Sequence, residues 1–190
     1  MSTALPTGTL TLAEFLALPE DGEVERELIR GEVRERPMTK RSRLHAKTQA
    51  RLSKILGVWL DSLPVPKGEL YAGEVGCILR RDPASNVGID VAYFSAETVA
   101  AQTDSTSMVE GVPVLAVEIL SPSDKQEDIA EKVDLYLETG VALVWILDPH
   151  FKTLIVHRGD VEPQLFNIKQ SVRDVPQLPG LSLDVKDLFD

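Results

Sequence analysis

Hydrophobic and polar positions along the chain predict two long amphipathic helices. Between residues 42 and 60 apolar side chains recur at spacings of three and four, which is the period of a helix with one buried face. Residues 125–138 repeat this pattern, and Gly140 follows them as a typical helix C-cap. A shorter helix is predicted over residues 11–18, because this segment opens with the Thr-x-x-Glu pattern of a capping box.

Short apolar runs predict strands between these helices. The segment VERELIRGEVRER (24–36) has the pattern of a hairpin whose two strands join at Arg30-Gly31. Further strands are predicted at 70–79, 89–95, 114–120, 142–148 and 153–158, with a short closing helix near 185–189. Strands and helices alternate only in part, so we expect an α/β fold in which helices flank a mixed sheet.

The composition is that of a globular chain without disulfides. Of the 190 residues, 43% are hydrophobic, 26% are charged and one, Cys77, is a cysteine, so an intrachain disulfide and a cysteine-based zinc cluster are excluded. No apolar run has the length of a membrane span, and the N-terminal segment lacks a basic region followed by an apolar one. We expect one domain, residues 1–190, that is cytoplasmic and makes no membrane contact.

The charge is distributed unevenly along the chain. The net charge is −10, yet residues 26–54 hold ten Lys or Arg against three acidic residues, a local charge of +7. Within the first long helix, Arg43, Lys47 and Arg51 stand four residues apart and form a basic stripe. This stripe is a candidate for contacts with a nucleic-acid backbone, although such a run is also typical of a solvated helix face.

Two carboxylates interrupt strands that are otherwise apolar. Glu118 stands inside VLAVEIL and Asp90 inside GIDVAYF. An unpaired carboxylate in an apolar interior costs several kcal/mol or more. Two such acids on neighbouring strands indicate a site for Mg²⁺ or Mn²⁺, which prefer hard oxygen ligands. The alternative is that one acid pairs with a buried arginine and the other ends its strand.

A lysine lies on the buried face of the second long helix. Ile129, Val133 and Tyr136 mark this face by their spacing, and Lys132 falls between them. A lysine in this position must either reach solvent or find a buried negative partner, and the strand that carries Glu118 directly precedes the helix. Two acids that hold a divalent ion, together with a lysine near the attacked phosphate, suit phosphodiester hydrolysis.

These residues also carry a family resemblance. The segments ELIRGEV, IDVAYFS, PVLAVEILSPSD, EKVDLYLETGVALVWILDP and TLIVHR resemble the Uma-two family of restriction endonucleases, within the PD-(D/E)xK nuclease superfamily. The resemblance covers roughly residues 10–185. It implies a restriction-endonuclease-like fold, a mixed sheet flanked by helices with an N-terminal helix and hairpin, and the catalytic acids at one sheet edge.

The resemblance assigns roles to individual residues. Asp90 matches the aspartate of the motif and Glu118 its second acid, and the carbonyl of Ile119 is expected to assist them as a metal ligand. The superfamily lysine is expected two positions after Glu118, where this chain has Leu120, and Lys132 stands where the lysine of this family has moved. Glu32 matches a family acid and is expected to join the catalytic group.

The leading hypothesis is therefore an Mg²⁺- or Mn²⁺-dependent endonuclease that acts on DNA. His45 is a weaker candidate for the same site. Symmetric cleavage of a duplex needs two sites, so a homodimer is also expected. Two alternatives stay open: a nucleic-acid-binding or interaction module that keeps the fold without turnover, and a structural core in which Lys132 bridges Glu118 and Asp90.

Overall fold

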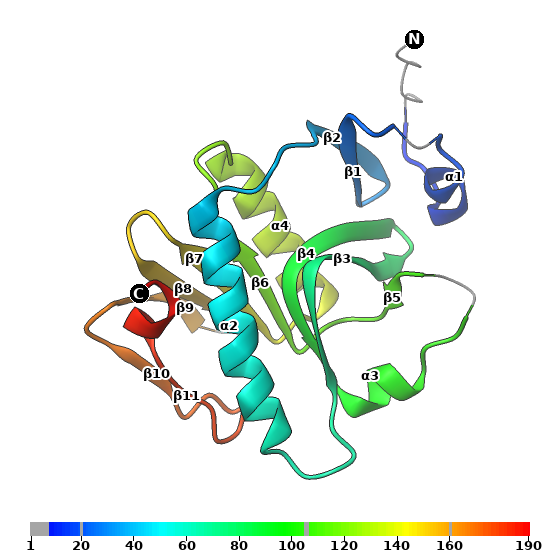
Figure 1. Cartoon of the computed structure of the whole chain (residues 1–190). Coiled ribbons are helices and arrows are strands. Elements are labelled where there is room, and N and C mark those ends of the chain that lie inside the picture. Colours follow the sequence, from blue (N-terminus) through cyan, green and yellow to red (C-terminus); the bar gives the residue numbers. More distant parts are fainter. Residues whose placement is uncertain (1–7, 20, 105–106, 160) are drawn as a thin grey trace.

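A nine-stranded mixed sheet with helices on both faces forms the body of the molecule (Figure 1). The structure is a computed structural model that describes residues 8–19, 21–104, 107–159 and 161–190. The helices are α1 (Leu12–Leu16), α2 (Arg43–Asp61), α3 (Ala96–Ala100), α4 (Gln126–Thr139) and the 3₁₀ helix η1 (Val185–Leu188). The strands are β1 (Val24–Ile29), β2 (Glu32–Pro37), β3 (Glu69–Arg81), β4 (Ala84–Phe94), β5 (Val109–Glu110), β6 (Leu115–Ile119), β7 (Leu143–Asp148), β8 (Thr153–Arg158), β9 (Val161–Asn167), β10 (Ser171–Arg173) and β11 (Ser182–Asp184).

The predicted helices form for local reasons that the structure makes visible. Thr11 and Glu14 make the predicted capping box at the start of α1. The Ser42 side chain caps α2 by accepting a hydrogen bond from the backbone N–H of His45. Gly140 ends α4 in the left-handed conformation, with φ of 98°, which glycine adopts without the steric cost that other residues meet.

The sheet is mixed, as the partial alternation of strands and helices predicts. Its main order is β2-β1-β4-β6-β7-β8-β9, and β3 pairs with β4 and β5. The pair β6–β7 is parallel, and α4 is its crossover connection. The α/β fold with helices flanking a mixed sheet is therefore confirmed.

One edge of β4 is shared between two other strands, and this division creates a fork. Along one edge β4 pairs with β3 for most of its length. Along the other, β1 pairs with β4 at Leu28 and Asn86, whereas β6 pairs with residues 91–93. In the described part of the chain, residues 87–90 of β4 therefore face the gap between β1 and β6 without a strand partner on that edge.

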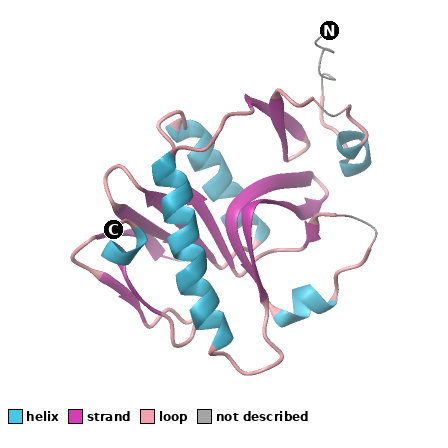
Figure 2. Ribbon diagram, viewed as in Figure 1, coloured by secondary structure: helices cyan, strands magenta, loops and turns pink. Residues whose placement is uncertain are grey.

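Two apolar cores hold this sheet between α2 and α4 (Figure 2). On the α2 face, Leu52, Leu56 and Trp59 pack against the sheet and the C-terminal segment around η1. On the α4 face, Val133 and Tyr136 pack against alternate residues of the same strands. The polar residues at the fork thus lie between two well-packed layers that fix the surrounding backbone.

Candidate active site

Four ionisable side chains from four separate elements meet at the fork. They are Glu27 of β1, Asp90 of β4, Glu118 of β6 and Lys132 of α4, with exposed fractions of 7%, 5%, 7% and 3%. Charged residues are seldom buried to this extent unless they are paired. We refer to these four residues as the fork cluster.

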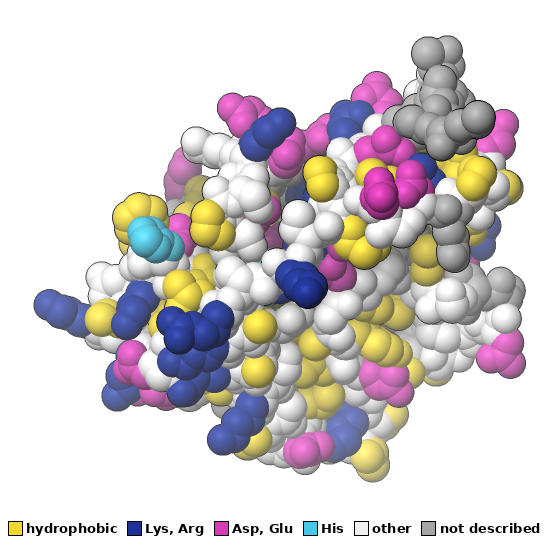
Figure 3. Space-filling model, turned by 45° about the horizontal axis from the view of Figure 1, so that its top comes forward, with side chains coloured by type: hydrophobic (Ala, Val, Ile, Leu, Met, Phe, Trp, Pro, Cys, Tyr) yellow, Lys and Arg dark blue, Asp and Glu magenta, His cyan; other side chains and the backbone are white. Residues whose placement is uncertain are grey.

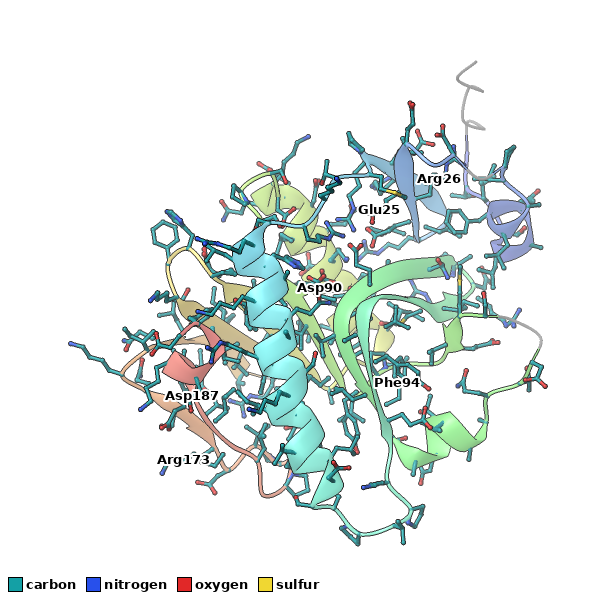
Figure 4. The ribbon with its side chains drawn as sticks, viewed as in Figure 1. Glu25, Arg26, Asp90, Phe94, Arg173 and Asp187 are labelled. Atoms are coloured by element: carbon teal, nitrogen blue, oxygen red, sulfur yellow. The ribbon has the colours of Figure 1, made fainter. Side chains whose placement is uncertain are left out.

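Asp90 is held by donors from two directions. The Ile119 backbone N–H donates a 2.7 Å hydrogen bond to Oδ2, and His45 Nε2 lies 3.2 Å from the same oxygen. Figure 4 shows Asp90 beside α2, the helix that supplies His45. Burial by itself would raise the pKa of this carboxyl, but the contacts with His45 and the Ile119 N–H together lower it. Asp90 is therefore an ionised acceptor, and His45 Nε2 is its donor.

The pairing of β4 and β6 sets Asp90 beside Glu118. The β4–β6 ladder ends at Val91 and Val117, so Asp90 and Glu118 are the next residues on the two strands at the point where the strands part. In addition to burial, the negative charge of Asp90 helps to raise the pKa of Glu118, so the two carboxylates are close enough to interact. The N–H and C=O of one strand residue point to the same side. Because the Ile119 N–H points to Asp90, the Ile119 carbonyl also faces this fork.

Lys132 uses all three of its donors inside the cluster. Nζ lies 2.8 Å from Glu118 Oε1, 3.1 Å from Glu27 Oε1 and 2.8 Å from the Gly88 carbonyl oxygen. Burial would lower the pKa of this ammonium group, but Glu118 and Glu27 outweigh it, so that the pKa is raised above its ordinary value. Lys132 is thus a buried cation bridging Glu118 and Glu27, whereas Asp90 pairs with His45.

Glu118 is almost fully removed from solvent at the fork. Burial raises its pKa to about 7, against the opposing influence of Lys132 and of the Tyr136 hydroxyl. Tyr136 donates its hydrogen bond to Oε1, the same oxygen that contacts Lys132. These contacts involve only Oε1, which leaves Oε2 as a potential ligand atom.

Glu27 is the residue that the sequence analysis missed. Its Oε1 accepts hydrogen bonds from Lys132 and, at 3.0 Å, from the Gly88 backbone N–H. On the unpaired edge of β4 the Gly88 N–H thus donates to Glu27 and the Gly88 carbonyl accepts from Lys132, so these side chains replace the hydrogen bonds of a neighbouring strand. On its face of the first hairpin strand Glu27 has the charged Glu25 on one side and the apolar Ile29 on the other, so the strand pattern does not mark it as buried in the way that it marks Glu118.

Comparison with known proteins decides the family. Residues 12–186 match the Uma2 family, which is described as "Putative restriction endonuclease". The chain belongs to this family. A solved structure, described as a "putative nuclease belonging to DUF820 from Anabaena variabilis ATCC 29413", superposes with a TM-score of 0.77. It shares 24% identity and covers 95% of this chain and 97% of its own, so it shows the same fold. No curated protein matches the sequence.

A divalent ion, which nuclease families of this fold use, suits the donor set of this Uma2 chain. The set consists of the carboxylates of Asp90 and Glu118 and the carbonyl of Ile119, all hard oxygen donors. Among the described residues, no three His, Cys, Asp or Glu side chains are grouped as a ready metal site. Two side chains and one carbonyl, completed by water and substrate, are the pattern that Mg²⁺ commonly takes.

Glu32 lies outside the fork cluster of this Uma2 chain. In the β1–β2 register Glu32 pairs with Ile29, two residues along each strand from the pair of Glu27 and Arg34 and closer to the turn. Its carboxylate is 59% exposed and accepts a 2.9 Å hydrogen bond from Arg34. The structure therefore does not bring Glu32 to Lys132, and Glu27 is the hairpin acid that makes this contact.

The basic stripe on α2 has neighbours of its own. Lys47 Nζ donates a 3.1 Å hydrogen bond to the carbonyl of Phe189, and Arg51 lies 3.5 Å from the carbonyl of Asp187. Both acceptors belong to the segment at and after η1, beside α2 (Figure 4). Two of the three basic residues thus attach the C-terminal segment to α2, and Arg43 stands exposed at the start of the helix.

A cleft of about 370 Å³ reaches two residues of the fork cluster, Glu27 and Lys132. It lies between the β1–β2 hairpin and the first half of α4. No helix in the described part of the chain combines the length and apolar character needed to cross a membrane.

Proposed function

We propose that this chain is a divalent-metal-dependent endonuclease that hydrolyses phosphodiester bonds in DNA. The observation that carries the proposal is the juxtaposition of Asp90 and Glu118 at the fork of the sheet, with the Lys132 ammonium 2.8 Å from Glu118. Asp90, Glu118 and the carbonyl of Ile119 would hold Mg²⁺ or Mn²⁺. Family membership makes nucleic acid the expected substrate.

The ion would supply activation of a water and neutralisation of charge that builds on the phosphate. Lys132 has the role of stabilising the attacked phosphate or orienting the water. All three of its donors are engaged at present, so it must exchange one partner for substrate. Glu118 is the partner to be exchanged, because it is also the proposed metal ligand, whereas Glu27 and the Gly88 carbonyl can keep Lys132 in place.

Contacts to DNA belong to the same proposal. Arg43 is exposed at the start of α2 and would contact the backbone, with Lys47 and Arg51 following along the same face. A homodimer remains a prediction for duplex cleavage, since a symmetric double cut needs two sites. A catalytic role for Glu32 would require its carboxylate to leave Arg34, with which it pairs within β2.

The test is calorimetric titration of Mn²⁺ into the wild type and into Glu118→Gln, followed by cleavage assays on labelled DNA. We expect saturable binding and cleavage for the wild type and the loss of both in the variant. Glu110→Gln is the matched control, since Glu110 pairs with Arg81 at the surface. Cleavage that persists in Glu118→Gln would show that the proposed site is wrong.

A second candidate is a nucleic-acid-binding module without turnover. The complete pairing of Lys132 favours it, because a lysine with three partners has no donor left for a phosphate. It predicts DNA binding that weakens with salt, and no cleavage with Mg²⁺ or Mn²⁺.

A further inference from the structure

The reacting groups of the proposed nuclease lie below the protein surface. Lys132 is 3% exposed and Asp90 is 5% exposed, and the approach to Lys132 is the cleft between the hairpin and α4. A phosphate that contacts Lys132 from outside must therefore enter this cleft. A substrate that stays on the outer surface of the protein does not reach the fork cluster.

The two walls of the cleft are joined by paired ionic contacts. Arg34 donates two hydrogen bonds to Glu131 of α4, at 2.7 and 3.1 Å. Arg30 likewise donates two to Glu138, at 2.7 and 2.9 Å. The Arg34–Glu131 pair is bidentate and has a fixed geometry, so it holds the two walls of the cleft together. Both Arg30 hydrogen bonds go to one oxygen of Glu138 and attach the hairpin turn to the last turn of α4.

The volume of the cleft limits what can enter. At about 370 Å³ it stands near the lower end of the range for small-molecule pockets, roughly 300–1,000 Å³. B-DNA has a major groove that alone is about 12 Å wide, so a duplex does not fit inside such a space. One unpaired strand can lay a nucleotide and its phosphate in the cleft.

The charge of the cleft lining also favours a single strand over a duplex. Six carboxylates and five cationic side chains line the cleft, so it carries no excess of positive charge. On the face seen in Figure 3, Lys and Arg side chains stand in separate groups among acidic and apolar ones. Duplex DNA carries one negative charge per roughly 1.7 Å of helix axis, which is twice the charge density of one strand. The binding of a duplex therefore depends more strongly on a continuous basic surface.

We propose that the substrate of this site is single-stranded nucleic acid, which enters between the β1–β2 hairpin and α4. The inference rests on the proposed function and narrows it. Lys125, exposed at the start of α4 and part of the cleft lining, is the cation that an entering strand meets first. A single strand needs one site for each cut, so this proposal does not require the homodimer expected for duplex cleavage.

The test measures binding and cleavage separately. Fluorescence anisotropy with Ca²⁺ would compare a labelled single-stranded oligodeoxynucleotide with the duplex of the same sequence. We expect the single strand to bind about tenfold more tightly. Equal or tighter binding of the duplex, or no binding of either, overturns the proposal. Preferential strand binding without cleavage in Mn²⁺ would uphold this inference and refute the proposed nuclease activity.

Two charge reversals locate the binding surface. Lys125→Glu should weaken single-strand binding about fivefold. It should also reduce the slope of the logarithm of the binding constant against the logarithm of the salt concentration by about one. Arg173→Glu is the control, because Arg173 is the exposed last residue of β10, far from Glu25 of the cleft (Figure 4). Equal effects of both variants would show that the strand does not use the cleft.

Discussion

Lys132 and Glu27 lie 105 positions apart in the chain and meet through a 3.1 Å hydrogen bond between ammonium and carboxylate. The same Glu27 oxygen accepts the Gly88 N–H, so one atom connects α4, the hairpin and the open edge of β4. Glu27 thereby keeps Lys132 at the fork even when Glu118 is engaged elsewhere. This makes Glu27 a positioning residue of the proposed site.

Glu27→Gln should slow cleavage more than it weakens substrate binding. Glutamine can still accept from Gly88, but Lys132 loses one of the two carboxylates that raise its pKa. We expect kcat to fall about tenfold with KM little changed, because Lys132 would act mainly in the transition state. The alkaline limit of activity should also move to lower pH, since the ammonium group would lose its proton more readily.

The control for Glu27→Gln is Glu110→Gln, which removes a surface partner of Arg81. It should leave both kcat and the pH profile unchanged. A Glu27→Gln enzyme with a normal pH profile would show that Glu27 does not set the protonation of Lys132.

The sequence predicted the elements that bury a periodic apolar face and missed those that do not. The helices α2 and α4 and the hairpin were predicted within a few residues. Strand β9 was missed because residues 161–167 are mostly exposed and include Pro163, which is typical of an edge strand. Strands β10 and β11 were missed because three-residue strands show no period.

The site residues that could be predicted from the sequence are those that place a charge within an otherwise apolar pattern. Asp90, Glu118 and Lys132 each break an apolar pattern, and each is buried at the fork. Glu27 lies in a hairpin where charged residues alternate on both faces, so its burial depends on how the hairpin sits against β4 and α4. The partners of Lys47 and Arg51 arise from the C-terminal segment, more than 130 positions away, which no local pattern reveals.

Asp90→Asn should abolish metal binding and also destabilise the fold. Removing a buried charge that has no partner stabilises a protein. The Asp90 carboxylate has partners, because it accepts hydrogen bonds from Ile119 and His45, and its pKa is lowered. We expect the free energy of unfolding to fall by about 1–2 kcal/mol near neutral pH. As pH drops through the lowered pKa of Asp90, wild type loses this advantage. Urea denaturation at neutral and acid pH measures the difference.

His45→Gln should weaken Mn²⁺ binding without removing a metal ligand. His45 Nε2 orients the Asp90 carboxylate, while Nδ1 is buried with no hydrogen-bond partner among the described residues. Loss of a residue that orients a ligand typically costs about 10–100-fold in metal affinity. Calorimetry on this variant and on His150→Gln, an exposed histidine, tests the role. Equal affinities in the two variants would remove His45 from the site.

Glu118→Gln should change how stability depends on pH. Burial raises the pKa of Glu118 to about 7 from an unperturbed 4.5, so within that window the folded protein holds a proton that the unfolded chain has released. Wild-type stability therefore falls as pH rises from about 4.5 to 7, by up to about 3 kcal/mol from this group. The variant lacks this loss, and its stability relative to wild type should rise across the window.

Urea denaturation of both proteins at several pH values measures this difference. Groups that titrate in both proteins cancel, so the slope reports Glu118 itself. The Glu110→Gln control should show no such rise, because Arg81 lowers the pKa of Glu110, so the pH dependence that Glu110 contributes has the opposite sign and is centred at lower pH. A flat difference for Glu118→Gln would mean that Lys132 and Tyr136 keep Glu118 ionised throughout. In that case protons would not compete with a metal for this carboxylate near neutral pH.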